Sequence, residues 1–96
     1  MKISVHHLAE QELDESTEYY ERSKSGLGME FLDAIETAVA EILENPSASE
    51  MLTEGQHRKV IRRFPFSIYY TKYHETIRIL SVAHQSRKPY YWRDRS

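Results

Sequence analysis

The chain has 96 residues, no cysteine and a formal net charge of −2, which indicates one domain spanning residues 1–96. The missing cysteines exclude a disulfide scaffold and a thiolate-bound metal, and no apolar run approaches the roughly 20 residues that cross a bilayer. The N-terminus also lacks the apolar core of a signal peptide, so we expect a soluble, cytoplasmic protein with no membrane partner.

The small net charge hides a division between the two halves of the chain. Residues 1–54 contain three Lys or Arg against thirteen Asp or Glu, a charge of −10. Residues 55–96 contain ten Lys or Arg against two Asp or Glu, a charge of +8. This division favours an anionic partner for the basic half. The alternative is that the two halves attract each other or form separate solvated faces.

The first half predicts one strand and two helices. Residues 2–6 alternate in polarity and predict a short strand. A helix should follow from about residue 7 to residue 23, although no standard N-cap residue stands at its start. The evidence for this helix is the helical spacing of small and apolar side chains at Ala9, Leu13, Ser16 and Tyr20.

A second and clearer helix follows the break at Gly26-Leu27-Gly28, where glycine supplies the positive φ of a turn. It should stop at Asn45, because Pro46 disfavours helical geometry in the residue before it. Two helices so closely joined predict an antiparallel hairpin. The apolar stripe of the second helix consists of Phe31, Ile35, Ala38, Val39 and Ile42.

The second half predicts a polar loop over residues 46–56 and then three strands, His57–Arg63, Ser67–Tyr73 and Thr76–His84. A bend at residues 64–66 and a hairpin turn at residues 73–76 should separate the strands. The apolar pair at residues 79–80 indicates that the last strand is central and covered on both faces. The order β-α-α-β-β-β predicts an α+β fold in which a helix hairpin packs on one face of a small, mainly antiparallel sheet. The other face should be available for binding.

Four motifs together resemble the RelE/ParE superfamily of toxins from bacterial type II toxin–antitoxin systems. They are ELDES with EYYE in the first helix, GLG before EFL, RRFPFSIYY, and AHQSRKPYYWRDR. The resemblance runs from Leu8 to Arg95 and implies a RelE/ParE-like toxin that a cognate antitoxin neutralises. RelE-like members cleave mRNA on the ribosome, whereas ParE-like members inhibit DNA gyrase and have no known nuclease chemistry.

The resemblance also bears on which branch this chain is closer to. RelE-like enzymes place Lys or Arg at two strand positions that correspond here to Val60 and Ser67, and only Arg87 matches their third cationic position. We therefore expect a ParE-like gyrase inhibitor with no cofactor and no metal. The alternative is a metal-independent endoribonuclease with His84 and Arg87 as catalytic residues, aided by residues 58, 59 or 62. A third possibility is an inactive member that only binds a partner.

Candidate target-binding residues lie in the basic strand and the C-terminal segment. If the strand runs to residue 63, Arg58 and Arg62 share one face and residues 59 and 63 the other. The alternative is that this charge protects a sheet edge from aggregation. His84 could likewise only end a strand and hydrogen-bond locally. The full candidate set is Arg58, Arg62, Arg87, Tyr90, Tyr91, Trp92, Arg93 and Arg95.

The aromatic residues divide into predicted core and predicted surface. Tyr20 and Tyr70 fall on apolar faces and should be buried. Trp92, with Pro89 and Tyr91, should pack the C-terminal segment back on the domain, surrounded by a basic patch of residues 87, 88, 93 and 95. Candidates for exposure and for stacking on nucleic acid bases are Tyr69, Tyr73, Tyr90 and Tyr91.

Overall fold

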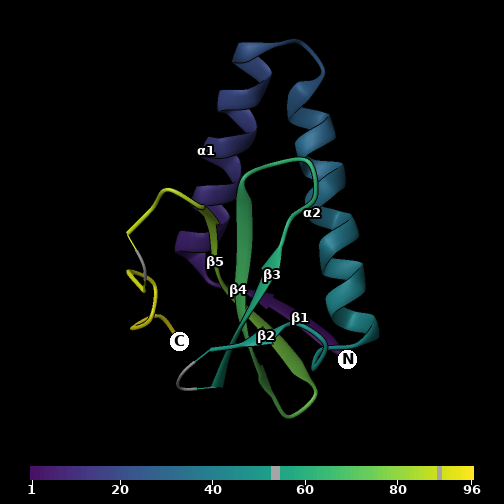
Figure 1. Ribbon diagram of the computed structural model, residues 1–96, viewed down its shortest axis with the longest axis vertical. Coiled ribbons are helices and arrows are strands. Elements are labelled where there is room, and N and C mark those ends of the chain that lie inside the picture. The colour runs from purple at the N-terminus through teal and green to yellow at the C-terminus, as the bar shows by residue number, and fades with distance from the viewer. Residues whose placement is uncertain (53–54, 89) are drawn as a thin grey trace.

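Two helices pack against one face of a five-stranded sheet (Figure 1). The computed structural model describes residues 1–52, 55–88 and 90–96. The elements are β1 (Lys2–Val5), α1 (His7–Ser23), α2 (Leu27–Glu44), β2 (Glu50–Met51), β3 (Gln56–Val60), β4 (Phe66–Tyr73) and β5 (Thr76–His84). The predicted α+β fold is confirmed, with one additional strand, β2. Within the described residues, neither helix has the apolar length that a bilayer crossing requires.

The strands lie in the order β1-β5-β4-β3-β2, and only the β1–β5 pair is parallel. The helix turn lies at one end of the long axis of the molecule and the β4–β5 hairpin turn at the other (Figure 1). Strand β5 is internal over its first half, because β1 pairs with it on one side and β4 on the other. Ile79 and Leu80 are both buried. This confirms the prediction from that apolar pair.

A β-bulge in β5 lets both faces of this strand be apolar. Tyr69 pairs with Ser81 while Tyr70 pairs with Ile79, so Leu80 is an extra residue without a partner in β4. Strict alternation would send side chains 79 and 82 to opposite faces. Both nevertheless belong to the helix-side core, because the bulge shifts the alternation by one residue.

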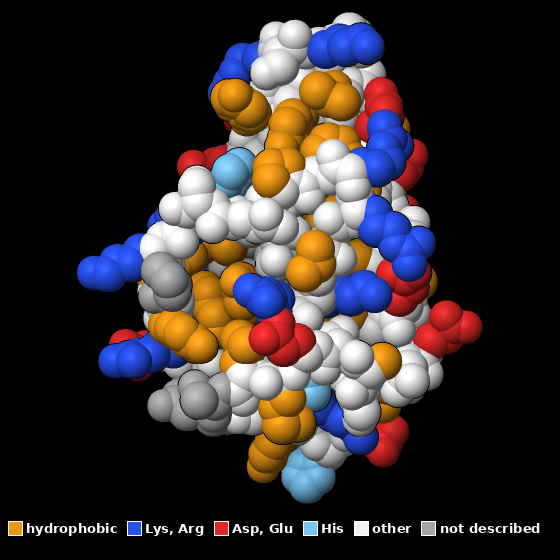
Figure 2. Space-filling model, viewed as in Figure 1, with side chains coloured by type: hydrophobic (Ala, Val, Ile, Leu, Met, Phe, Trp, Pro, Cys, Tyr) orange, Lys and Arg blue, Asp and Glu red, His pale blue; other side chains and the backbone are white. Residues whose placement is uncertain are grey.

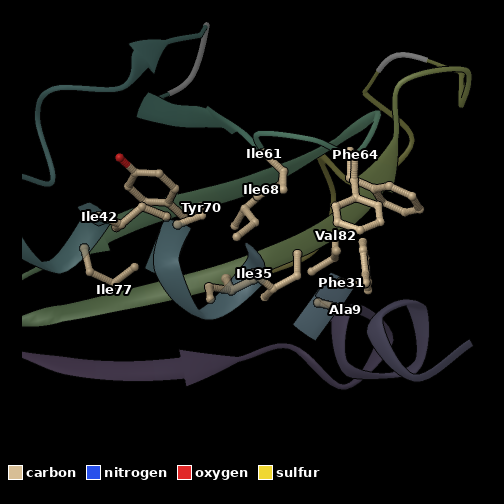
Figure 3. Packing of buried hydrophobic residues seen from close by; sticks show 13 residues of the cluster. Ala9, Phe31, Ile35, Ile42, Ile61, Phe64, Ile68, Tyr70, Ile77 and Val82 are labelled. Carbon is tan, nitrogen blue, oxygen red and sulfur yellow. The ribbon is translucent and has the colours of Figure 1, made fainter. Parts of the chain in front are cut away.

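The core lies between the helix hairpin and the sheet (Figure 3). The predicted stripe of α2 is confirmed, since four of its five members are buried and Val39 packs against them. Tyr20 of α1 adds an aromatic cluster, with ring centroids 5.1 Å from Phe31 and 5.0 Å from Phe64. The other buried members, from β4 and β5, are Phe66, Ile68, Tyr70, Ile77, Ile79 and Val82.

The start of α1 explains why the sequence showed no standard cap. Strand β1 ends at Val5 rather than His6, and His6 is the N-cap residue. Its Nδ1 accepts a hydrogen bond from the backbone N–H of Leu8 at 3.1 Å. An imidazole thus performs the role that Ser, Thr, Asp or Asn usually perform.

The turn between the helices depends on two glycines in different ways. Gly26 has φ +90, the left-handed conformation that the sequence predicted. Gly28, in contrast, lies inside α2, so the break comes earlier than predicted. The Glu21 carboxylate accepts hydrogen bonds from the backbone N–H groups of both glycines, at 3.0–3.1 Å, which places negative charge at the N-terminus of α2.

Gly28→Ala is expected to lower the free energy of unfolding by about 1–2 kcal/mol, although alanine is the better helix former. A Cβ atom there would stand 2.9 Å from the Thr17 carbonyl oxygen and 3.0 Å from the Glu21 Cβ. The helices would have to separate. Urea denaturation measures the loss, with Glu36→Ala at an exposed site of α2 as the control. Equal stability of both variants would contradict close packing at Gly28.

Two predicted boundaries around β3 were wrong. Residues 50–51 were assigned to a loop but form β2, which pairs with β3 through Glu50↔Arg58 and Met51↔His57. Two residues carry no periodic signal, so only their partner strand defines them. Strand β3 also ends at Val60, three residues earlier than expected, because the chain turns at Arg63 with φ 74.

Candidate functional site

The C-terminal tail, defined here as residues 85–88 and 90–96, lies beside β5 in Figure 1, and its Trp92 packs on the sheet face opposite the helices. Trp92 is 2% exposed and stacks on Tyr69 of β4, with ring centroids 4.1 Å apart. This confirms that Trp92 packs the tail onto the domain. Pro89, predicted to join that packing, lies outside the described residues. The far face of the sheet is thus partly covered rather than wholly free.

The strand registers define the side chains under and beside the tail. Neighbouring positions such as Lys59, Ile68 and Val82 face the helices, since Lys59 binds Glu41 of α2 and the other two lie in the core. Alternate positions therefore face the tail. These are the cross-strand rows Arg58–Tyr69–Ser81 and Val60–Ser67–Ala83.

A carboxylate of α1 fixes the tail to the outer edge of β5. Glu12 receives both terminal guanidinium nitrogens of Arg95, at 3.1 Å each, and the Tyr91 hydroxyl at 2.7 Å. It also accepts from the Ser81 hydroxyl at 2.9 Å and the Val82 backbone N–H at 3.0 Å. That N–H lies on the part of β5 beyond β1, so Glu12 satisfies an edge donor that would otherwise lack a strand partner.

This Glu12 network, comprising residues 12, 81, 82, 91 and 95, perturbs two pKa values. Burial raises the pKa of Glu12, but hydrogen bonds from Arg95, Tyr91, Val82 and Ser81 together lower it more, so the net pKa is below the usual value. Burial raises the pKa of the Tyr91 hydroxyl, and its hydrogen bond to Glu12 raises it further. At neutral pH, Glu12 is therefore ionised and accepts these hydrogen bonds, and the Tyr91 hydroxyl keeps the proton that it donates.

The acidic and basic halves of the chain attract each other, one of the alternatives that the sequence left open. Within residues 1–52, 55–88 and 90–96, five ion pairs connect them: Glu50–Arg58, Glu41–Lys59, Glu41–Arg62, Glu30–Arg63 and Glu12–Arg95.

Three of the predicted target-binding arginines are members of these pairs. Arg58 and Arg62 do not share a face, which corrects the prediction. Because β3 ends at Val60, Arg62 turns towards α2 and lies 3.5 Å from Glu41, whereas Arg58 stays on the tail side beside Glu50. Arg95 is 13% exposed at its side chain and lies inside the Glu12 network.

Other predicted residues form an exposed basic and aromatic surface. Arg87, Tyr90 and Arg93 are exposed, and the Arg87 guanidinium carbon lies 4.2 Å from the Tyr91 ring centroid, a cation–π contact. In Figure 2, hydrophobic side chains lie beside Lys and Arg side chains where the tail crosses the sheet. Tyr73 is exposed as expected, but it lies at the end of β4, next to the hairpin turn and not in the tail. Tyr69 and Tyr91 were predicted to be exposed and are instead half-buried.

His84 ends β5 and bonds locally, as the alternative interpretation held. Its Nδ1 accepts from the Ser86 backbone N–H at 3.0 Å and lies 2.8 Å from the Ser86 hydroxyl. The imidazole also lies edge-on to Phe66, with centroids 5.2 Å apart. Val60 and Ser67, where RelE-like enzymes carry cations, are direct cross-strand partners.

Two hollows meet at His84 and Arg87. The first, about 440 Å³, lies between α1 and the free edge of β5, and its lining includes Glu12, Tyr19 and Tyr20. The second, about 220 Å³, lies between the sheet and the tail. His84 and Arg87 line both hollows and form the ridge between them.

Sequence reasoning missed Glu12 and Ser81 as organising residues. A signal for Glu12 was present, because it stands three residues after Ala9 and four before Ser16, on the stripe that α1 buries. An acid on a buried stripe indicates a buried partner. Ser81 gave no such signal, since a small residue in a strand predicts no hydrogen bond.

The comparisons with known proteins agree with this architecture. A solved chain titled "Chromosomal ParDE TA system from P. aeruginosa" matches with a TM-score of 0.64 and 20% identity, covering 88% of this chain and 95% of that one. At that identity the likeness shows the fold alone. No sequence among the curated proteins matches. The family described as "ParE toxin of type II toxin-antitoxin system, parDE" matches residues 3–89. The chain therefore belongs to the ParE toxin family of type II toxin–antitoxin systems.

Proposed function

We propose that this protein inhibits bacterial growth by binding DNA gyrase, and that a cognate antitoxin neutralises it in the cytoplasm. The observation that carries the gyrase proposal is the pair Val60↔Ser67. These partners occupy the positions where RelE-like nucleases present cations, and here they are an exposed apolar side chain and a buried hydroxyl. Membership of the ParE family supports the same target.

RNA cleavage is the second candidate and rests on one observation, the shared ridge of His84 and Arg87. Metal-independent cleavage requires a base, an acid and cations that stabilise the charge on the phosphate. Arg58 is the nearest cation on the tail side of β3, but Glu50 already binds its guanidinium. On the tail side of β3, His84 and Arg87 therefore lack the additional free cation that a metal-independent nuclease requires.

The exposed members of the predicted set are the residues that we assign to target contact. They are Arg87, Tyr90 and Arg93, which are all exposed at the surface of the tail. Tyr91, Trp92 and Arg95 hold that surface in place from below. Arg58 lies at the border of that surface, bound to Glu50 of β2. Arg62 lies on the helix side of the sheet, bound to Glu41 of α2.

The antitoxin contact that we propose is the hollow between α1 and β5. Its apolar lining comes from Tyr19, Tyr20, Phe66 and Val82, and Tyr19 is 61% exposed. An exposed aromatic at an apolar hollow suits a partner that binds by helix-in-groove packing, whereas strand addition is disfavoured because Glu12 and Arg95 already bind the edge groups of Val82 and Leu80. Co-expression with the product of the adjacent reading frame should yield a stable complex, and Tyr19→Ala should weaken it.

A paired assay tests the gyrase proposal. The purified protein should inhibit DNA supercoiling by gyrase and leave a translated message intact. Arg87→Ala should raise the inhibitory concentration roughly 10- to 100-fold, because a hydrogen bond to a charged group is worth about 1.5–3 kcal/mol. Arg22→Ala removes the same charge at the exposed last turn of α1 and serves as the control.

The opposite pattern would overturn the proposal. Cleavage of the message with undisturbed supercoiling would make His84 and Arg87 a nuclease site. His84→Ala would then abolish the cleavage. Under the gyrase proposal, His84→Ala leaves inhibition within about threefold of the unsubstituted protein, since the imidazole bonds only within its own turn.

A further inference from the structure

We propose that the hollow between the tail and the sheet binds one nucleotide of single-stranded DNA, with its phosphate on Arg87 and Lys88 and its base on Tyr90. This inference goes beyond the proposed function, because a protein that only contacts gyrase requires no nucleic acid site. Binding of DNA is separable from gyrase inhibition, and either can fail alone.

The charge of this hollow is the first observation. Its lining includes Arg58, Arg87 and Lys88 and contains no Asp or Glu among the described residues. Among those residues, Arg87 and Lys88 make no ion pair, whereas Arg58, Lys59, Arg62, Arg63 and Arg95 each pair with a glutamate. Two cations without a carboxylate partner, one of them resting on the Tyr91 ring, form a site for a phosphodiester, whose oxygens accept charge-assisted hydrogen bonds.

The aromatic lining is the second observation. Tyr69, Tyr90, Tyr91 and Trp92 border the same hollow. Trp92 and Tyr69 stack on each other, so these ring faces are not available to a ligand. Tyr90 is 40% exposed and can offer one ring face to a base. Cations interleaved with aromatic rings are the usual platform for single-stranded nucleic acid, because every base has a π face.

The backbone of Tyr90 supplies a third observation. Its φ is 64, a left-handed conformation that a residue with a Cβ rarely adopts. Backbone strain of this kind persists where the surrounding structure holds it, and it concentrates at ligand sites. Trp92 holds Tyr90 here, with ring centroids 5.6 Å apart. The ring of Tyr90 is thus fixed at the rim rather than free to turn away.

An unpartnered donor lies at the opposite wall. The Nε of Arg58 is buried and has no hydrogen-bond partner within the described part of the chain, although Glu50 binds the end of the same guanidinium. Because that nitrogen has almost no exposed surface, an entering phosphate or base oxygen can reach only the terminal nitrogens of Arg58, whose side chain is 41% exposed. The hollow, at about 220 Å³, has room for a base and a phosphate but is far too small for a duplex. The occupant is therefore an unpaired base with its phosphate.

Fluorescence anisotropy of labelled dT12 with the purified full chain tests this inference. We expect binding that weakens with salt, by a slope of about −0.7 per phosphate contacted. Arg87→Ala should reduce both the affinity and the size of that slope. Tyr90→Ala should reduce the affinity roughly tenfold with an unchanged slope, since stacking releases no counterions. Tyr90→Phe should retain binding, and Arg22→Ala should match the unsubstituted protein.

Three results would overturn the inference. One is the absence of dT12 binding at low salt by a protein with a normal thermal transition. Another is equal loss in Arg87→Ala and Arg22→Ala, which indicates attraction by net charge alone. A third is indifference to Tyr90→Ala, which indicates a phosphate site without a base site. A parallel titration with rU12 distinguishes the sugar, and binding of rU12 alone would overturn the assignment to DNA.

Discussion

Replacing Trp92 by alanine is expected to lower the free energy of unfolding by about 3–5 kcal/mol. Trp92 is 2% exposed, stacks on Tyr69 with ring centroids 4.1 Å apart, and lies 5.6 Å from Tyr90. Its loss would leave a cavity over the tail-facing side of β4. Domains of this size are stabilised by only about 5–15 kcal/mol in total.

Thermal denaturation followed by circular dichroism measures this effect. Each kcal/mol lowers the midpoint of a domain this small by roughly 4–8 °C, so Trp92→Ala should melt at least about 12 °C below the unsubstituted protein. Tyr73→Ala is the matched control, because Tyr73 is 71% exposed and its truncation should cost no more than about 0.5 kcal/mol. Similar midpoints for the two variants would show that the tail contributes little to folding.

Glu12→Gln is expected to destabilise the protein by about 3 kcal/mol at pH 7, the lower end of the cost of breaking a buried ion pair. The amide keeps the shape of the side chain but removes the charge opposite Arg95, whose side chain is 13% exposed. It also places an NH₂ donor among groups that donate. Arg95 would then be left half-buried without its counter-charge.

The sign of the pH dependence follows from the pKa of Glu12, which is lower in the folded protein than its ordinary value of 4.5. A depressed carboxyl pKa contributes stability that is fully present above the unfolded value and is lost as the pH falls through the folded value. The stability difference between the unsubstituted protein and Glu12→Gln should therefore be constant from pH 7 to about 5. Below pH 4.5 it should shrink.

Urea midpoints between pH 3 and pH 7 measure that difference, and titration of the other carboxyl groups cancels between the two proteins. Glu10→Gln, at an exposed position on the same helix, is the control and should follow the unsubstituted protein throughout. A difference for Glu12→Gln that stays constant down to pH 3 would show that the charge of Glu12 contributes nothing. The remaining cost would then come from shape and hydrogen bonding alone.

Local periodicity explains which parts of the fold were predictable. The bounds of α1 and β5 match the sequence expectation, because a stripe at spacing 3.6 or 2 is written within the element itself. The same holds for the buried stripe of α2 and for its end before Pro46. The bulge at Leu80 was visible only as an apolar pair.

Features that depend on a partner element were not predictable. Strand β2 exists only because β3 pairs with it, and a histidine caps α1 where no cap was expected. Arg62 points to α2 because the chain turns after Val60, which a continuous strand would not do. The obstacles differ: the two residues of β2 are too few for a periodic signal, histidine is not among the usual cap residues, and the ion pair of Arg62 with Glu41 joins separate elements.

The sequence by itself determined the helix hairpin, the mainly antiparallel run of the last strands, the core stripes and the ParE-like character of the chain, since each depends on residues close in sequence or on motif order. Only the tertiary structure decided which charges remain available at the surface. Glu12 and Arg95 are 83 residues apart, and their meeting depends on how α1, β5 and the tail pack. That packing buries Trp92 and Arg95 and leaves Arg87 and Tyr90 exposed, because a side chain's partner is fixed by register and layer rather than by its residue type.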